Sequence, residues 1–332
     1  MPVLPRPIIL LLMVLAALLV CYPLYGQWLL GDKAEFFMQK LTTIMIFAMF
    51  ALSLELLVGL TGLVSLGHAL FFGLAGYCLV LLTPEYETVS LWWALPVSLL
   101  ITGIVAAIVG MLCIRTAGVY FIMVTLAFGQ MGFYLFNDSD LAGGSDGLFI
   151  YFKPTLTLAG VTLLDLENRQ TFFYLTLVFL IAVFILLWRL SRSPFGRVII
   201  GIRDNEHRVR ALGYNATLYK LVSFILAAML AGLAGFLFVA QYGFANPSLL
   251  GWHQSGHVLM MVILGGMGTL FGPMLGALIF ELLHYGYESL TEHWLLLMGL
   301  TIIAVVALLP GGIGGLLLSL TTSRTAPEPD DE

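Results

Sequence analysis

The sequence predicts an all-α polytopic membrane protein with about eight to ten transmembrane helices, some of them broken by glycines. Of its 332 residues, 60% are hydrophobic and only 10% are charged, and the mean hydropathy is +1.02. A single soluble core of this length does not need so much apolar surface. The longest apolar runs have about 20 residues, which suits a helix that crosses roughly 30 Å of hydrocarbon and exceeds the strands of a membrane barrel.

The membrane spans are expected in ten apolar stretches: 8–25, 37–59, 63–83, 91–113, 118–136, 171–189, 220–242, 257–271, 273–289 and 293–310. The first is interpreted as an uncleaved helix, because no A-x-A-like cleavage site ends it and another span follows closely. The eighth is short for a complete crossing. Cys21, Cys78 and Cys113 lie in apolar runs without paired spacing, so we expect neither disulfides nor a metal site.

The basic residues predict the orientation of the chain. Seven of the fourteen Lys and Arg residues lie in one polar segment: Arg189, Arg192, Arg197, Arg203, Arg208, Arg210 and Lys220. The positive-inside rule places this segment in the cytoplasm. Counting spans from it places both termini in the cytoplasm and the loop 137–170 outside. We expect one transmembrane domain over 1–318, with a cytoplasmic loop at 192–219, and a disordered cytoplasmic tail at 319–332.

The cytoplasmic segment contains a pattern that is typical of an amphipathic helix. In "IIGIRDNEHRVRALG", Ile199, Ile202, Val209 and Leu212 can form one apolar stripe, and Gly213 is placed to end the helix. Such a helix either lies on the lipid surface or docks into a cytosolic partner. Both interpretations remain open from composition alone.

The stretch "SLGHALFFGLAGY" (65–77) places a histidine and three glycines inside an apolar run. Glycine weakens a helix by about 1 kcal/mol relative to alanine, and Ser65 and His68 can bond the backbone groups that a break would free. We expect a broken helix that lines a cavity between Gly62 and His68, or else a histidine bonded across a helix interface. A similar glycine cluster begins "GGMGTLFGPMLGALIFE" (265–281), where the glycines serve either a pathway or close helix packing.

Two acidic residues, Glu55 and Glu281, fall within predicted spans. A carboxylate near the membrane centre costs at least about 2.5 kcal/mol, so it faces the protein interior or water. A proton relay is conceivable, but carboxylates satisfied by neighbouring helices are the simpler interpretation. Glu281 and His284 are three residues apart on one helical face, which permits a structural pair.

Two further polar motifs lie in the exported segments. "LAGGSDGLF" combines adjacent glycines with Ser145 and Asp146, a composition that forms a tight turn. It either receives a binding protein, gates the outer mouth, or is an ordinary turn. "HQSGH" spaces His253 and His257 like zinc ligands, but no third ligand is evident, so we expect no metal there.

Several motifs occur in an order that resembles a known family. These are "GLTGLVSLGHALFFGLAGY", "GGSDGL", "SPFGRVIIGIRDNEHRVRALGYN", "KLVSFILAAMLAGLAGFLF", "MVILGGMGTLFGPMLGA" and "PGGIGGLL". Together they are similar to the LivM-type permease subunits of branched-chain amino acid ABC importers, and the resemblance covers about residues 40 to 317. It departs from the family at Ala142, where a threonine is usual, and at Glu55, where a neutral amide is common.

The resemblance implies an ABC importer permease fold in the bacterial inner membrane. It also implies a second, LivH-type permease subunit, two cytosolic ATPases and a periplasmic substrate-binding protein; lipid surrounds the chain, and no nucleic acid is expected. The chain has no G-x-x-x-x-G-K-[ST] loop. We therefore expect a non-enzymatic transport subunit that binds no cofactor and relies on ATP used by its partners.

The resemblance assigns the cytoplasmic segment to a coupling helix that docks into the ATPase. The coupling residues are Phe195, Gly196, Arg203, Glu206, Arg208, Ala211 and Gly213. The expected translocation pathway comprises Glu55, Gly62, Ser65, Gly67, His68, Gly265, Gly266 and Gly268. The expected docking site for the binding protein, or outer gate, comprises Gly143, Gly144, Ser145 and Asp146.

The expected substrate is a branched-chain, aliphatic amino acid. Urea or short amides are the alternative within the same architecture, because their permeases share the "SLGH" segment and a similar arginine-rich loop. A secondary transporter driven by protons through Glu55, Glu281 and His68 is the alternative from a different class.

Overall fold

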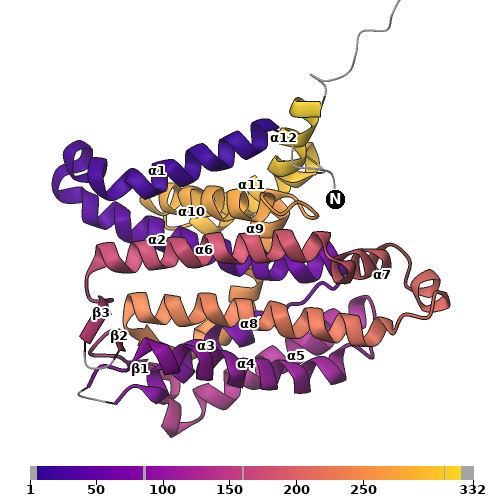
Figure 1. Cartoon of the computed structure of the whole chain (residues 1–332), viewed down its shortest axis with the longest axis horizontal. Coiled ribbons are helices and arrows are strands. Elements are labelled where there is room, and N and C mark those ends of the chain that lie inside the picture. The colour runs from indigo at the N-terminus through magenta and orange to yellow at the C-terminus, as the bar shows by residue number, and fades with distance from the viewer. Residues whose placement is uncertain (1–5, 85–86, 159–160, 310, 323–332) are drawn as a thin grey trace, which may run out of the picture.

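The computed structural model describes residues 6–84, 87–158, 161–309 and 311–322, and it is built almost entirely of helices (Figure 1). Its α-helices are α1 (Arg6–Leu30), α2 (Ala34–Glu55), α3 (Ala69–Leu82), α4 (Leu91–Cys113), α5 (Val119–Asn137), α6 (Arg169–Arg192), α7 (Pro194–Ala211), α8 (Ala216–Tyr242), α9 (Trp252–Gly265), α10 (Gly272–Leu290), α11 (Trp294–Leu308) and α12 (Gly312–Thr322). Seven helical segments in this part of the chain are long and apolar enough to cross a membrane. The predicted fold class is therefore confirmed.

Two predicted spans differ from the structure: 257–271, because α9 ends at Gly265 and the chain is not helical over 266–271, and 63–83. The chain is not helical over 63–68, and α3 begins only at Ala69. Gly62 ends the preceding turn with a φ of 76°, a left-handed conformation that glycine adopts without strain. The predicted span 63–83 is thus wrong in its first third, whereas the predicted break between Gly62 and His68 is present.

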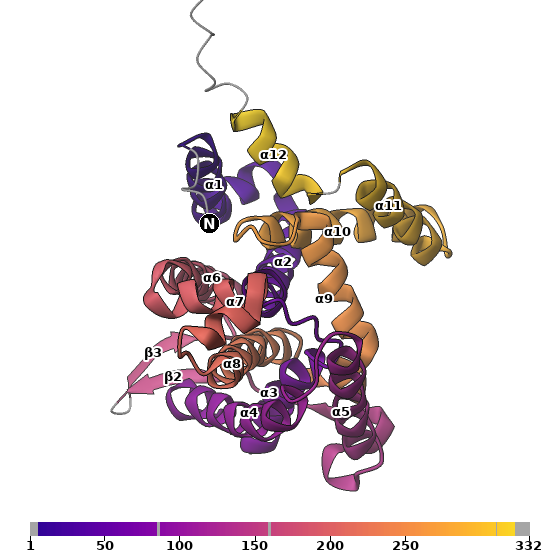
Figure 2. The ribbon, with the colours of Figure 1, turned by 90° about the vertical axis from the view of Figure 1, so that its right-hand side faces the viewer.

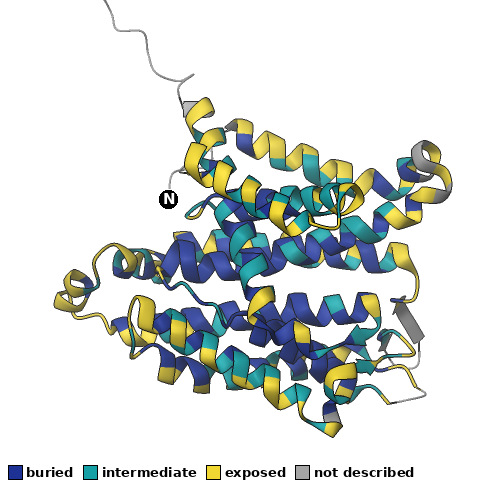
Figure 3. Ribbon diagram, turned by 180° about the vertical axis from the view of Figure 1, so that it is seen from behind, coloured by how far each residue is buried: buried dark blue, intermediate teal, exposed yellow. Residues whose placement is uncertain are grey.

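The buried layers surround α2 and α8. In the most apolar stretch of α2, 89% of the residues are buried, against 11% in α1 and 17% in α5. Figure 2, viewed from the α7 end, shows α2 between α6, α8, α9 and α10, with α1, α11 and α12 at the periphery. Figure 3 shows the same gradient, from dark blue inner helices to yellow outer ones. Apolar side chains exposed on the outer helices are expected where the surrounding medium is lipid.

Small residues allow α3 and α8 to pack closely. A Cβ atom at Gly235 of α8 would lie 1.8 Å from the carbonyl oxygen of Phe72, and one at Gly76 of α3 would lie 2.5 Å from the side chain of Val239. In lipid, where helices gain little from burying apolar surface, such close backbone approach is a main source of packing energy. The glycines of "GLAGY" and "LAGLAG" thus have a packing role.

Short strands and α7 occupy opposite ends of the molecule (Figure 1). The strands are β1 (Leu148–Phe149), β2 (Thr155–Leu158), β3 (Val161–Asp165) and β4 (Phe244–Ala245). β1 pairs antiparallel with β4, so that Leu148 lies opposite Ala245, and β2 pairs antiparallel with β3. The predicted exported loop 137–170 and the predicted cytoplasmic segment 192–219 therefore lie at different ends of the bundle.

The amphipathic helix of the cytoplasmic segment exists, but it is not straight. Asn205 has φ −160° and ψ 97° in the middle of α7, and its side chain accepts a hydrogen bond from the Arg208 amide, 3.0 Å away, as a new helix N-cap does. Ile199, Ile202 and Val209 are buried, whereas Leu212 is 72% exposed. The predicted stripe is therefore wrong at Leu212, because the kink and the helix end at Ala211 turn that side chain away.

The C-terminal region of the chain is described only in part. Residues 319–322 belong to α12, so the predicted tail begins within this helix. Residues 323–332 lie outside the described residues, so the predicted disordered tail stays a prediction.

Candidate functional site

The site begins where α2 ends in a π-helical turn, η2 (Leu56–Thr61). This turn has an i→i+5 pattern, and Thr61 Oγ1 supports it by donating to the Leu56 carbonyl, 2.8 Å away. Gly59 leaves room on the inner side of the turn: a Cβ atom there would lie 1.8 Å from Oε1 of Glu55. The Glu55 carboxyl therefore occupies the space beside Gly59. π-turns often occur at functional sites.

Glu55 joins this turn to a distant part of the chain. Its side chain is fully buried, and its Oε1 accepts a hydrogen bond of 2.7 Å from the Gly268 amide. Gly268 belongs to the glycine turn between α9 and α10 and has a φ of 85°. Oε2 has no hydrogen-bond partner within the described part of the chain. The carboxyl is thus held by a backbone amide.

Arg203 reaches the same turn from α7. Its Nη1 donates to the Gly59 carbonyl, while its Nε and Nη2 both donate to Oδ1 of Asp204, 3.1 Å away. The arginine stem lies against Gly62, where a Cβ atom would be 2.8 Å from Arg203 Cγ. Consequently α7, the π-turn and the α9–α10 turn meet at Gly59, with Arg203 and Glu55 as the connecting side chains.

His68 is buried on the other side of α2. Its Nε2 lies 2.9 Å from Ser53 Oγ, and its ring is stacked on Phe50 with a centroid distance of 5.6 Å. Ser53 donates its own proton to the Phe50 carbonyl, 2.6 Å away, so Nε2 of His68 must be the donor in the other bond. Nδ1 then remains a buried acceptor without a partner among the described residues.

Serines satisfy backbone amides where the broken segment enters α3. Ser255 Oγ of α9 accepts from the Ala69 amide at 2.9 Å, and Ser65 Oγ accepts from the Gly67 amide at 3.3 Å. Gly67 also touches α5, because a Cβ atom there would lie 2.0 Å from the Thr125 carbonyl oxygen. Non-helical backbone at this depth is tolerated only when it is buried and satisfied in this way.

Six of the eight predicted pathway residues are buried, whereas Gly62 is exposed and Gly268 is half-buried. Glu55, Ser65 and His68 have no exposed surface. Gly265 and Gly266 pack against backbone: Cβ atoms there would lie 2.1 Å from the Gly272 carbonyl oxygen and 2.3 Å from that of Gly311. Close helix packing explains these two glycines, and a role of the eight residues in translocation stays a prediction.

The predicted coupling residues divide into an inward and an outward group. Besides Arg203, Phe195 and Gly196 face inward: Phe195 stacks on Tyr219 at 5.3 Å, and a Cβ atom at Gly196 would lie 2.1 Å from the Leu190 carbonyl oxygen. The outward group is exposed and consists of Arg208, Ala211 and Gly213, whereas the Arg203 side chain is 36% exposed although its guanidinium reaches the Gly59 carbonyl. The first group fixes α7 to the bundle, and the second is free to meet another molecule.

Glu206 connects α7 to α8. Its Oε2 accepts from Lys220 Nζ and its Oε1 from Arg210 Nη2, both at 2.6 Å. Burial alone would raise the pKa of the Glu206 carboxyl, but these hydrogen bonds and charges outweigh burial and lower that pKa below its usual value. The carboxylate therefore stays charged and holds the second half of α7 in place.

A groove of about 460 Å³ lies between the two halves of α7 and the start of α8. Its lining combines cations with apolar surface and includes Arg197, Arg208, Val209, Leu212 and Tyr214. Gly213, with a φ of 89°, ends the helix as predicted, and its amide donates to the Arg210 carbonyl at 2.9 Å. The exposed Leu212 belongs to this surface.

The outer turn lies beside β1 and β4. Gly143, Gly144 and Gly147 all have positive φ angles of 74°, 57° and 73°, and Ser145 and Asp146 are exposed between them. A Cβ atom at Gly147 would lie 2.3 Å from the Ala245 carbonyl oxygen. The turn is therefore anchored to the segment after α8. Its role in docking or gating stays a prediction.

Two residues of the site were missed from the sequence. Gly59 leaves space for the Glu55 carboxyl, and its carbonyl accepts a hydrogen bond from Arg203. The sequence signal for this role is its position four residues after a buried acid, on the same helical face. Ser255 lies within "HQSGH", and nothing in that motif indicates a serine that accepts from the distant Ala69 amide. In the described chain no group of three His, Cys, Asp or Glu side chains could hold a metal ion.

The helices and this site define the class of protein, which is a multi-pass membrane transport subunit. Its core is broken by a glycine-rich segment, and Arg203 joins this core to α7 at one end of the bundle. Residues 36–306 match the family described as "Branched-chain amino acid transport system / permease component", and the chain belongs to that family. The resemblance noted from the motifs is thus confirmed.

Curated relatives cover most of the chain. It is 31% identical over 292 residues to the high-affinity branched-chain amino acid transport system permease protein LivM of Salmonella typhimurium, an alignment that covers 82% of this chain and 68% of the relative. Escherichia coli LivM is similar to the same extent over 291 residues, covering 82% and 68%. The D-allose permease protein AlsC of E. coli is 33% identical, over 40% of this chain and 43% of its own length. No solved structure matches the chain.

Family membership fixes the general activity. The chain is the permease component of a bacterial ABC importer and a multi-pass membrane protein, and it is not itself catalytic. A permease of this kind works with ATPase and binding-protein partners, and no cofactor is expected in the chain itself. The proton-driven secondary transporter is accordingly set aside.

Proposed function

We propose that this chain is the LivM-type subunit of an importer for branched-chain, aliphatic amino acids. The support is the similarity to two LivM proteins over 82% of the chain, far more than the similarity to a sugar permease covers. In this proposal the chain lies in the inner membrane with both termini in the cytoplasm. A LivH-type permease, two ATPases and a periplasmic binding protein complete the importer.

The proposal assigns different tasks to the two faces of α7. The outward residues Arg208, Ala211 and Gly213 contact the ATPase. The inward residue Arg203 transmits the motion of α7 to the π-turn, because its guanidinium holds the Gly59 carbonyl. Rigid-body motion of a partner becomes a change inside a bundle only through such a contact.

Glu55 extends the same connection to the second glycine turn. Its bond to the Gly268 amide means that a shift of the π-turn also displaces the start of α10. The segment Gly62–His68 and the turn Gly265–Gly268 would then move together and open the translocation pathway. The exposed turn at Gly143–Asp146 serves as the outer docking site or gate. The single observation that carries this coupling route is the Arg203–Gly59 contact.

The test uses the complete importer, purified and reconstituted in proteoliposomes with its binding protein. Two arginines of α7 form a matched pair: Arg203→Ala removes the inward contact and Arg208→Ala removes an exposed side chain. For Arg203→Ala we expect normal subunit assembly and ATP hydrolysis but leucine uptake reduced about tenfold or more, because a hydrogen bond from a charged group contributes about 1.5–3 kcal/mol. For Arg208→Ala we expect weaker co-purification of the ATPases.

Two results would contradict the assignment of the faces. Normal leucine uptake by Arg203→Ala would remove this residue from the coupling route. Loss of the ATPases from Arg203→Ala, as strong as from Arg208→Ala, would mean that Arg203 belongs to the ATPase surface.

The substrate is tested separately by competition. Uptake of urea or acetamide without uptake of leucine, isoleucine or valine would make the substrate assignment wrong and leave the coupling route intact.

A further inference from the structure

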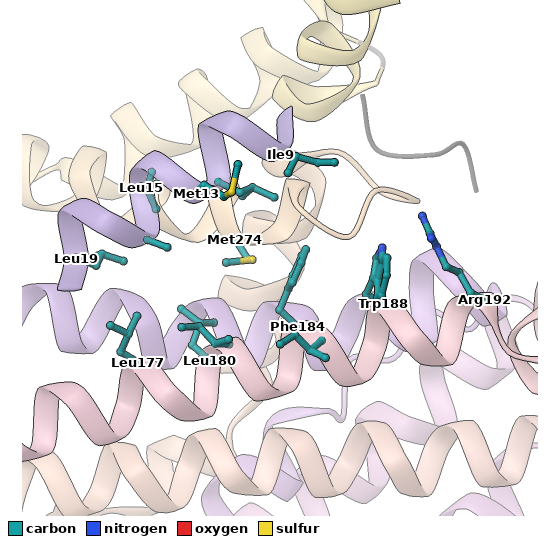
Figure 4. A pocket seen from close by; sticks show the side chains of 14 residues that line it. Ile9, Met13, Leu15, Leu19, Leu177, Leu180, Phe184, Trp188, Arg192 and Met274 are labelled. Carbon is teal, nitrogen blue, oxygen red and sulfur yellow. The ribbon is translucent and has the colours of Figure 1, made fainter. Parts of the chain in front are cut away.

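An apolar groove separates the first helix from the rest of the bundle. It has a volume of about 430 Å³ and lies between α1 and α6, with Met274 of α10 at its back (Figure 4). In the figure, Ile9, Met13 and Leu19 lie along the α1 side of the groove, Leu180 lies along the α6 side, and the Phe184 ring rises from α6 toward α1. Apart from Trp188 and Arg192, the lining consists of aliphatic and aromatic side chains without nitrogen or oxygen.

The groove exists because α1 contacts the bundle mainly near the two ends of α1. At one end the Tyr22 ring packs on Phe173, with centroids 6.2 Å apart, and Tyr174 donates to the Val20 carbonyl. At the other end Ile8 is buried against Phe271 and Leu275. An apolar gap of this size inside a membrane loses dispersion contacts unless hydrocarbon fills it. Its natural occupant is an acyl chain of the bilayer.

The positively charged side chain of Arg192 lies at one end of the groove. The Arg192 guanidinium lies 4.2 Å from the centroid of the Trp188 ring, and Arg192 is exposed. No acidic side chain within the described ranges pairs with it. Arg189, one turn earlier on α6, is exposed as well. This is the predicted cytoplasmic end of α6, where anionic lipids attract basic residues.

We infer that this groove binds one anionic phospholipid of the inner leaflet, with an acyl chain between α1 and α6 and the phosphate at Arg192. The charge of the mouth selects the headgroup, because Arg192 lines it and no acidic side chain of the described residues pairs with this arginine or is placed to bind the ammonium of a zwitterionic lipid through it. The stacked Trp188 holds the guanidinium in place. The orientation in this inference rests on the proposed function, but the lipid preference does not.

The experiment uses the whole importer in nanodiscs of phosphatidylcholine that contain a small fraction of phosphatidylglycerol. Bromine on the acyl chains of either lipid quenches nearby tryptophan, and the difference between wild type and Trp188→Phe isolates the signal of Trp188. We expect brominated phosphatidylglycerol to quench Trp188 more strongly than the same fraction of brominated phosphatidylcholine. Arg192→Gln should lower this preference about fivefold, the factor that one basic residue contributes at a membrane surface.

Two control variants separate charge from folding. Arg192→Lys keeps the charge and should keep most of the preference. Arg115→Gln removes an exposed arginine of the α4–α5 connection and should leave the preference unchanged. Equal quenching by both lipids in the wild type would overturn the inference. So would quenching of Trp188 by neither lipid, which would mean that a companion subunit covers the groove in the importer.

Discussion

At the scale of single residues, the partners of buried polar groups are the least predictable feature. Glu55 was recognised as a buried acid from the sequence, yet its partner is the Gly268 amide, which is 213 residues away along the chain. No local pattern encodes such a contact. The expected pair of Glu281 and His284 is absent from the hydrogen bonds and ion pairs of the described residues, and His284 instead packs its ring on Trp294, 4.2 Å away.

The ion pairs of Glu206 predict a pH dependence of stability. A carboxyl whose pKa is lower in the folded than in the unfolded chain stabilises the fold above its unfolded pKa, about 4.3, and this stabilisation is lost as the pH falls through the folded pKa. We expect Glu206→Gln to lower the thermal unfolding temperature at neutral pH, and this difference to begin shrinking as the pH falls below about 4.3 and to vanish only below the lowered pKa of the folded chain. Unfolding in detergent across this range measures it.

Glu292→Gln is the matched control for Glu206, since Glu292 is exposed and has no ion pair within the described residues. It should leave the unfolding temperature unchanged at each pH. A difference between wild type and Glu206→Gln that grows as the pH falls would show that the carboxylate does not stabilise α7.

At the scale of elements, helix ends were predictable where a local signal sets them. Gly213 ends α7 and Gly62 ends the turn after α2, both with positive φ, and both were marked as breaks in the sequence. The π-turn at Leu56–Thr61 and the kink at Asn205 were not predicted. Both depend on what the chain packs against: the Glu55 carboxyl beside Gly59 in one case, and the docking of Arg203 just before the kink in the other.

The contact between the broken segment and α5 gives a test at this scale. A methyl group at Gly67 would lie 2.0 Å from the Thr125 carbonyl oxygen, which is backbone and cannot rotate away. We expect Gly67→Ala to destabilise the protein by about 1–3 kcal/mol, as overpacking in a core does. Chemical or thermal unfolding of the purified chain in detergent measures the change.

Gly256 of α9 provides the comparison for Gly67. No atom lies within 4 Å of a Cβ placed there, so Gly256→Ala should be neutral or stabilise the helix by up to about 1 kcal/mol. If Gly67→Ala were as stable as Gly256→Ala, α5 would have to be free to move away from the segment, and the close packing described above would have no energetic weight.

At the scale of the whole molecule, the order of the spans and the separation of its two ends were predictable from hydropathy and charge. The pairing of β1 with β4 was not, because each strand has only two residues and carries no periodic signal. The sequence also does not predict that α1 packs loosely on the bundle. Its apolar sequence resembles that of the central α2, and only tertiary packing decides which of the two is buried.

The orientation gives a prediction for the whole chain. In a Cys21→Ser background, where the remaining cysteines Cys78 and Cys113 are buried, we introduce Ser145→Cys or Ala211→Cys. A membrane-impermeant maleimide should label the first in spheroplasts and the second only in inverted vesicles, provided that the cells lack the ATPases. The reverse pattern of labelling would invert the proposed topology.

The pairing of β1 and β4 has a consequence for how the bundle can deform. Hydrogen bonds between these strands, and the 2.8 Å bond from the Ile150 amide to the Gly243 carbonyl, tie the ends of α5 and α8 together on the side away from α7. A displacement applied at the α7 end must therefore pivot about this tie. The helices would separate mostly at the α7 end. Their spacing at the β1–β4 end would stay the same.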